Sequence, residues 1–246
     1  MTRRGLFAPL LGLLFGGTAC APLRLAAGGA GTDRLRYGDD PRQTVEIHAP
    51  PRAEDRPVLV LFHGGDRYGP DRARARDAAR ALAKRGFVVV LADMRTGSGL
   101  GSGAAFIEDA AAATAWAGDR AAEFGGDPAR LGVLGRGVGA DAALMIALDR
   151  RYMASRGRPD LIRAAASWGR PDPARDPTLT QPEAYVRADA PPVWLIDGGE
   201  ADAALAARIR AVGGRVEVDA GQAAPLDGTT DFLRRALAPL SPGRVA

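Results

Sequence analysis

The sequence contains a single cysteine, Cys20, and a single lysine, Lys84, in 246 residues. One cysteine excludes any disulfide bond within the chain. Because lysine is nearly absent, the basic character comes from arginines, and these alternate with aspartate and glutamate instead of forming a block. The formal net charge is only +4 and no nucleic-acid-binding module accompanies it, so the composition argues against a nucleic-acid partner.

The N-terminal apolar run, residues 6–15, is too short to span a bilayer comfortably. Two arginines precede it, and small residues and Cys20 follow, as in a secretory signal peptide. A lone cysteine after Thr-Ala resembles the acylation site of bacterial lipoproteins, although Gly17 stands where that pattern usually has leucine. We therefore expect a signal peptide over residues 1–19, an acylated Cys20 and lipid anchoring in the cell envelope. The alternative is an ordinary secretory signal that releases the chain.

Residues 20–42 show no apolar period and predict a flexible tether, and residues 43–240 predict a single domain. Short apolar runs predict strands at residues 44–48 (an edge strand), 58–62, 87–92, 131–134, 163–167, 193–196 and 215–218. Helices are expected between them at residues 71–85, 106–124, 140–148, 201–212 and 229–237. This alternation predicts the α/β class: a three-layer α/β/α sandwich with a mostly parallel, doubly wound sheet. Residues 170–192, rich in proline and charge, are expected to cross the surface.

The most informative stretch is residues 131–148, which reads as a buried strand, a glycine-dense turn and a helix. Its turn, residues 135–139, has the sequence GRGVG. A strand, a turn with glycines two residues either side of the centre, and a helix form the nucleophile elbow, G-x-S-x-G. The central residue here is Gly137, which has no hydroxyl group. The sequence therefore predicts the frame of an elbow without its nucleophile.

With this elbow, residues 58–237 resemble the α/β-hydrolase fold, and within it small bacterial esterases and kynurenine-formamidase-like proteins. Residues 63–65, His-Gly-Gly at the end of a predicted buried strand, resemble the oxyanion loop of that family. Residues 124–128, FGGDP, resemble the segment that leads into its elbow. Asp109 and Trp116 lie upstream at the expected helical spacing.

The resemblance implies a serine, a histidine, an orienting acid and amide donors for an oxyanion. Asp202 matches the position of the acid, although it also reads as a surface residue near a helix start. Gln222 stands near the position of the histidine, and an amide is no general base near neutral pH. The amides of Val138, Gly64 and Gly65 match the oxyanion donors.

The first functional hypothesis is a non-catalytic protein on a hydrolase frame, because the serine and the histidine are missing together. It would bind a small acyl or carbonyl-bearing ligand or an unidentified protein partner, with no cofactor and no metal. A phosphate or dinucleotide site is disfavoured, because the glycine-rich loop at residues 97–103 has no following lysine and the elbow strand has no acidic partner at the usual offset.

The second hypothesis is an active ester or amide hydrolase with a displaced nucleophile. Ser98, Ser102 and Ser167 are the candidate nucleophiles, and none of them lies in an elbow. His63 or His48 would have to serve as the base, although His63 is better read as a structural residue of its loop. This hypothesis requires a hydroxyl group within hydrogen-bond reach of His63.

Overall fold

The computed structural model describes residues 34–64, 70–95, 104–171, 180–219 and 225–239. Its strands are β1 (Leu35–Arg36), β2 (Thr44–His48), β3 (Arg56–Phe62), β4 (Val88–Asp93), β5 (Gly126–Arg136), β6 (Ile162–Trp168), β7 (Val193–Ile196) and β8 (Val216–Asp219). The helices are α1 (Pro70–Lys84), α2 (Ala104–Arg120), α3 (Val138–Leu148), α4 (Arg150–Ala154), α5 (Gly199–Ala211) and α6 (Pro225–Ala236), with short 3₁₀ turns η1 (Ala121–Phe124) and η2 (Pro182–Tyr185).

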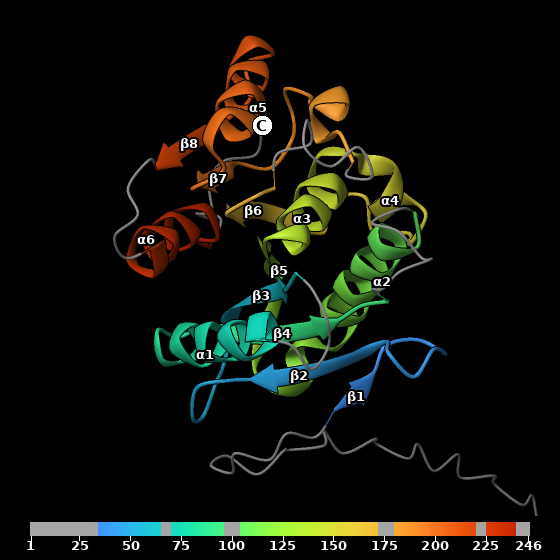
Figure 1. Ribbon diagram of the computed structural model, residues 1–246. Helices are drawn as coiled ribbons and strands as arrows, with labels where there is room; N and C mark the ends of the chain where they lie inside the picture. The colour runs from blue at the N-terminus through green and yellow to red at the C-terminus, as the bar shows by residue number, and fades with distance from the viewer. Residues whose placement is uncertain (1–33, 65–69, 96–103, 172–179, 220–224, 240–246) are drawn as a thin grey trace, which may run out of the picture.

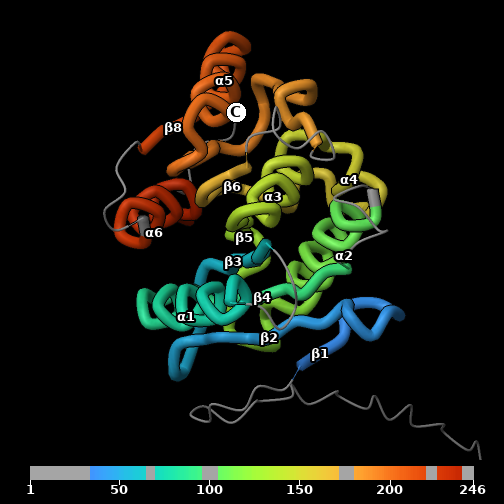
Figure 2. Tube along the Cα trace, viewed as in Figure 1, coloured from blue at the N-terminus to red at the C-terminus, as the bar shows by residue number. Residues whose placement is uncertain are grey.

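The described strands form one sheet in the order β1-β2-β4-β3-β5-β6-β7-β8. All neighbouring strands from β4 to β8 run parallel, and β2 joins β4 antiparallel. Helices α1 and α6 cover one face, and α2, α3, α4 and α5 cover the other (Figures 1 and 2). The predicted three-layer α/β/α sandwich with a mostly parallel sheet is therefore confirmed.

Both faces of the central strands are buried, which explains their continuous apolar sequences. In β3, Val58, Val60 and Phe62 pack into the core beneath α2 and α3. Leu59 and Leu61, between them in sequence, pack into the opposite core beneath α1 and α6. A strand that separates two cores needs apolar residues at consecutive positions, so it does not show the alternation of apolar and polar residues that is typical of a half-buried strand.

The winding of the sheet reverses between β3 and β5, since the chain runs from β3 outward to β4 and then returns to β5. Phe62, the last residue of β3, lies in register with Gly135, near the end of β5. The carboxyl ends of parallel strands at such a reversal are where ligands bind in open α/β sheets. The two predicted site segments, residues 63–65 and 135–139, directly follow these ends.

Several boundaries differ from the predictions. The strand predicted at 131–134 is the long β5, whose bulged pairing with β3 extends it back to Gly126. Residues 44–48 are not the edge strand, because Leu35–Arg36 pairs with them as β1. The tether prediction is therefore wrong for residues 34–42, where Tyr37 also donates a hydrogen bond from its hydroxyl to the Asp93 carbonyl.

Candidate active site

The elbow has the geometry that the sequence predicts. Gly137 has φ 56° and ψ −128°, the mirror image of an extended turn residue. Its amide donates to the Trp168 carbonyl at 3.0 Å, and its carbonyl accepts from the Ala140 amide at 2.9 Å. A Cβ atom at position 137 would approach only the Gly64 Cα, at 3.9 Å. The turn therefore has room for a side chain, and a residue other than glycine would be opposed only by the positive φ.

The two flanking glycines are required by close packing. A Cβ at Gly135 would lie 2.1 Å from the Gly139 carbonyl oxygen, and one at Gly139 would lie 2.5 Å from the Phe62 carbonyl oxygen. These contacts are with backbone atoms of α3 and β3, which have no flexible side chain to move aside. The glycines at 135 and 139 thus hold the first turn of α3 against the sheet.

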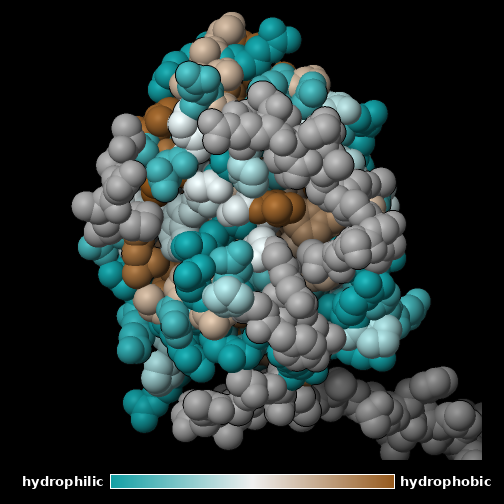
Figure 3. All heavy atoms as spheres, viewed as in Figure 1, coloured by the Kyte–Doolittle hydropathy of each residue, from teal (hydrophilic) through white to brown (hydrophobic). Residues whose placement is uncertain are grey.

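The predicted oxyanion loop lies against the elbow. A Cβ at Gly64 would lie 2.8 Å from the Val138 amide nitrogen and 3.1 Å from the Arg136 carbonyl oxygen. Val138 begins α3, and the first amides of a helix have no acceptor within that helix. The structure therefore brings Gly64 and Val138 together, while Gly65 lies outside the described residues. In Figure 3 a small apolar patch appears over α3 near the centre of this face.

His63 is held by a buried carboxylate. Its side chain is buried, and its Nε2 donates to Asp93 Oδ1 at 3.0 Å. Arg72 donates to both oxygens of Asp93, at 2.6 and 3.1 Å. Burial raises the Asp93 pKa, but the hydrogen bonds from His63 and Arg72 outweigh that effect and hold the pKa at about 2. Asp93 is therefore ionised, and His63 has the geometry of a structural residue that fixes the start of the Gly64 loop.

The same ionic network reaches Glu46 on β2. Arg72 donates to Glu46 at 3.2 Å, and Arg76 donates to both Glu46 oxygens at 2.9–3.1 Å. His48 Nε2 lies 3.0 Å from Glu46 Oε1. Burial raises the Glu46 pKa, and the neighbouring His48 and the hydrogen bonds from Arg76 reverse this and lower the pKa below its ordinary value. Both histidines of the sequence thus lie beside carboxylates of this network.

Sequence reasoning missed this network, although two signals were present. Glu46 is a charged residue among buried positions of a predicted strand, and Asp93 directly follows an apolar run. Asp109, part of the family resemblance, has a similar role: its buried carboxylate accepts from the Arg95 amide and guanidinium and from Gln43. Trp116 stacks on Phe124 with ring centroids 6.1 Å apart, so both residues serve packing.

Asp202 lies in the first turn of α5 and is only 2% exposed, so it is no surface residue. Its Oδ2 accepts from the Gly198 amide at 3.0 Å. Its Oδ1 has no hydrogen-bond partner among the described residues. Burial raises the Asp202 pKa to about 6, although the Gly198 hydrogen bond and the charge of Arg170 oppose this. Gln222 lies outside the described residues, so its position relative to Asp202 is not described.

We expect Asp202→Asn to stabilise the protein at pH 7. A pKa raised from 3.8 to about 6 means that the fold binds the proton more tightly than the unfolded chain does. The protonated Asp202 therefore contributes about 3 kcal/mol to the free energy of unfolding. This contribution is fully present below about pH 4 and is lost as the pH rises through about 6. Urea unfolding of both chains at pH 4 and pH 7 measures it. If the stability of Asp202→Asn relative to the parent chain does not increase from pH 4 to pH 7, the raised pKa of Asp202 is contradicted. The exposed Asp160→Asn is the control.

Of the displaced nucleophiles, only Ser167 lies among the described residues. It is fully buried in β6, between Gly135 of β5 and Leu195 of β7, and its Oγ has no hydrogen-bond partner there. No hydrogen bond joins it to either histidine among the residues described. Ser98 and Ser102 lie outside the described residues.

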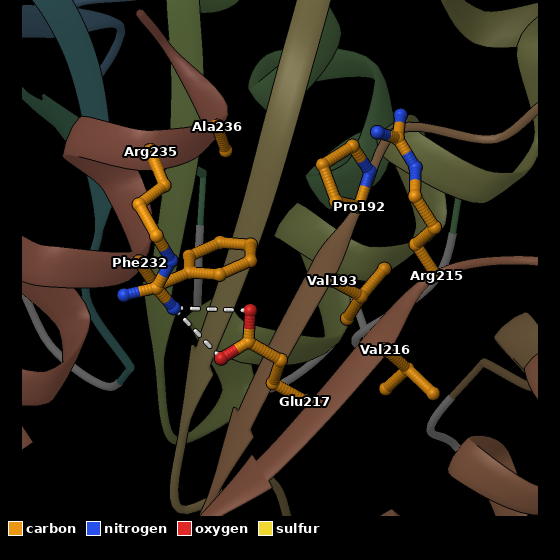
Figure 4. A pocket seen from close by; sticks show the side chains of 8 residues that line it. All are labelled: Pro192, Val193, Arg215, Val216, Glu217, Phe232, Arg235 and Ala236. Carbon is orange, nitrogen blue, oxygen red and sulfur yellow. Dashed lines mark hydrogen bonds and ion pairs between the residues drawn. The ribbon is translucent and has the colours of Figure 1, made fainter.

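A separate hollow lies at the opposite end of the sheet (Figure 4). It has a volume of about 190 Å³, and Val193 and Val216 in its lining are the first residues of β7 and β8. The ion pair between Arg235 and Glu217 crosses one side at 2.8 Å. Ligand sites usually exceed about 300 Å³, so the hollow is smaller than a typical ligand site.

Among the described residues, no cluster of three or more His, Cys, Asp or Glu side chains is placed to hold a metal ion. No helix in that part of the chain has both the length and the apolar character that crossing a bilayer requires.

The chain was compared with known proteins. The BD-FAE family model matches residues 45–157. Carboxylesterase NlhH of Mycobacterium tuberculosis is 32% identical over 165 residues, which are 66% of this chain and 48% of that protein. The probable isoprenylcysteine alpha-carbonyl methylesterase ICMEL2 of Arabidopsis thaliana is 28% identical over 122 residues, covering 49% of this chain and 29% of the relative. The chain thus spans about half the length of the first of these relatives, and less of the second.

Solved esterases share the fold. Esterase 2 of Thermogutta terrifontis, phosphoramylated by tabun, superposes with a TM-score of 0.71 at 23% identity and covers 89% of this chain and all of its own. Its propionate-bound form gives a TM-score of 0.71 at 21% identity, covering 86% of this chain and 97% of its own. Together with the geometry of the elbow, this likeness shows that the chain has the α/β-hydrolase fold.

Proposed function

We propose that this protein binds a ligand on a hydrolase frame without hydrolysing it. The observation that carries the proposal is Gly137, which places a hydrogen atom where the elbow would present a nucleophile. The surrounding geometry is retained, including the close-packed glycines at 135 and 139. An elbow preserved in shape but lacking a hydroxyl group is suited to binding.

The state of the acid and the histidines supports the same proposal. Asp202 has a buried oxygen without a partner, at the position where the resemblance puts an acid that orients a histidine. His63 donates to Asp93, and His48 lies beside Glu46. Neither histidine is hydrogen-bonded to a serine among the described residues, so no described nucleophile has a general base.

The ligand class follows from the groups that remain. Amide donors at the start of α3 and in the loop at Gly64 are suited to a carbonyl or carboxylate oxygen. We therefore propose a small acyl or carbonyl-bearing ligand, bound at the carboxyl ends of β3 and β5.

A second candidate is an active esterase, and the comparisons favour it over the first. The named relatives are carboxylesterases and methylesterases, and the solved neighbours are esterases. In this chain the nucleophile would be Ser98, Ser102 or Ser167. Ser167 is fully buried in this structure, so it is not exposed as a nucleophile of an elbow would be.

A fluorophosphonate probe distinguishes the two candidates without knowledge of the substrate. The full chain, purified in detergent, is incubated with the probe beside an active serine esterase, and intact mass is measured. We expect no adduct on this chain and a complete adduct on the control. A stoichiometric adduct that maps to Ser98, Ser102 or Ser167 would overturn the binding proposal and identify the nucleophile.

We further propose that the chain is exported and anchored by a lipid on Cys20, because a short apolar run and small residues precede this cysteine. Incorporation of labelled palmitate during bacterial expression measures this. Loss of the label in Cys20→Ser is expected, and an unlabelled parent chain would contradict the anchor.

A further inference from the structure

Beside the elbow, four buried side chains each have a polar atom with no hydrogen-bond partner among the described residues. The atoms are Asp141 Oδ1, Ser167 Oγ, Arg170 Nε and Asp202 Oδ1, and none of these residues is more than 3% exposed. Across the described chain only seven side-chain atoms are in this state, so more than half of them gather here. Buried polar groups in folded proteins are almost always hydrogen-bonded, and exceptions indicate a missing water, ion or ligand.

These four residues form one cluster at the carboxyl ends of β5, β6 and β7. Asp141 lies in the first turn of α3, four residues after Gly137, and Arg170 Nε lies 3.5 Å from its Oδ1. Ser167 lies opposite Gly135 in the sheet. Asp202 is near enough to Arg170 for the positive charge to lower its pKa. The cluster is therefore adjacent to the elbow, and its residues come from three different parts of the fold.

The other contacts of this cluster leave its charge unbalanced. Glu183 of η2 accepts from both terminal nitrogens of Arg170, at 2.5 and 3.3 Å. Thr180 donates its amide and hydroxyl to the second oxygen of Asp141. The cluster thus has three carboxylates, Asp141, Glu183 and Asp202, and one guanidinium, Arg170, which pairs with both Glu183 and Asp141. Burial raises the pKa of Asp141 and of Asp202, and the charge of Arg170 opposes this only in part.

We propose that this cluster receives an ammonium group of the ligand. One oxygen of Asp141 and one of Asp202 have no hydrogen-bond donor in the part of the chain that the structure describes, and an ammonium group supplies three donors together with a positive charge. Water satisfies hydrogen bonds but leaves the charge unbalanced. The inference rests on the proposed function, in which the carbonyl of the same ligand lies at the elbow. The ligand class is then an amine-bearing acyl compound.

Matched pairs of small amides test this inference. Glycinamide, β-alaninamide and 4-aminobutyramide have a carbonyl and an ammonium group, whereas acetamide, propionamide and butyramide are their neutral counterparts. Affinities for the full chain in detergent are measured at pH 7 by ligand-observed NMR titration. We expect at least one amino amide to bind about tenfold or more tightly than its neutral partner. Asp141→Asn and Asp202→Asn should each abolish that preference, while the exposed Asp160→Asn should leave it intact.

Each other outcome has a distinct meaning. Equal affinities within every pair would overturn the inference and leave the proposed carbonyl site standing. A preference that persists in both Asn variants would place the amine elsewhere and also overturn it. No binding by any of the six compounds would contradict both the inference and the proposed ligand class. Thermal unfolding of each variant shows that it is folded, and the two independent acids provide a test even where one variant fails to fold.

Discussion

A chain that carries both Gly137→Ser and Gln222→His is expected to hydrolyse p-nitrophenyl acetate about 10²–10⁴-fold faster than a chain with Gly137→Ser alone, the range that a positioned general base contributes. The serine has room, because a Cβ at position 137 approaches only Gly64 Cα, at 3.9 Å. The resemblance places residue 222 near the family's histidine, and Asp202 would be available to orient it, because one Asp202 oxygen accepts from the Gly198 amide and the other has no hydrogen-bond partner among the described residues. The double variant supplies the two groups that the sequence lacks.

The single variant is expected to hydrolyse the ester far more slowly than the double variant. Its serine would have the amide donors of the elbow but no base, since His63 is hydrogen-bonded to Asp93. An oxyanion site without an intact triad retains roughly 10³–10⁴-fold over water in a well-studied protease, far short of an enzyme. Esterase activity in Gly137→Ser that equals the double variant would show that a base is already present, and would overturn the non-catalytic proposal.

A matched control separates chemistry from backbone strain. Gly137→Ala places a Cβ at the same positive φ of 56°, and we expect it to destabilise the fold by about 1–3 kcal/mol, like the serine. It has no hydroxyl, so Gly137→Ala with Gln222→His should show no gain in hydrolysis. Adding Asp202→Asn to the active double variant should remove most of the gain. Retained activity in that triple variant would contradict the acid role of Asp202.

Much of the fold and of the elbow follows from local sequence. The glycines at 135 and 139 predict a close contact of helix and strand, and the structure has it as Cβ positions 2.1–2.5 Å from backbone oxygens. Consecutive apolar residues in β3 predict burial on both faces, which the two cores confirm. These features depend on near neighbours in the chain or on a single strand, so one sequence is sufficient to predict them.

The features that local sequence did not predict depend on distant residues. The weak apolar pattern at residues 163–167 predicts β6 as a strand, but its central place in the sheet depends on its pairing with β5 and β7. Residues 35–36 show no strand signal and become β1 only by pairing with β2. The cluster at Arg170 was expected on the surface, yet Arg170 is 3% exposed because Asp141 and Glu183, from two other elements, surround it.

The buried network on the other side of His63 gives the second large expected effect. Arg72→Met is expected to reduce the free energy of unfolding by about 3–5 kcal/mol, because it removes the arginine that pairs with the buried Asp93 and one of the two arginines that pair with Glu46. Asp93 would lose two hydrogen bonds and Glu46 one, while both remain almost fully buried. Methionine has a similar helix propensity and length, so the effect measures the charge and its hydrogen bonds.

Arg74→Met on the same helix is the matched control. Arg74 pairs with Asp71 at 3.1 Å, but its side chain is 61% exposed, and exposed pairs contribute about 1 kcal/mol or less. For a domain of this size the Arg72 effect corresponds to a fall in Tm of roughly 6–20 °C, against about 4 °C at most for Arg74. Because His63 depends on Asp93 and precedes Gly64, a folded Arg72→Met chain should also bind carbonyl ligands more weakly. If Arg72→Met and Arg74→Met have the same Tm and bind carbonyl ligands equally well, the network at Asp93 stabilises neither the fold nor the loop beside the elbow.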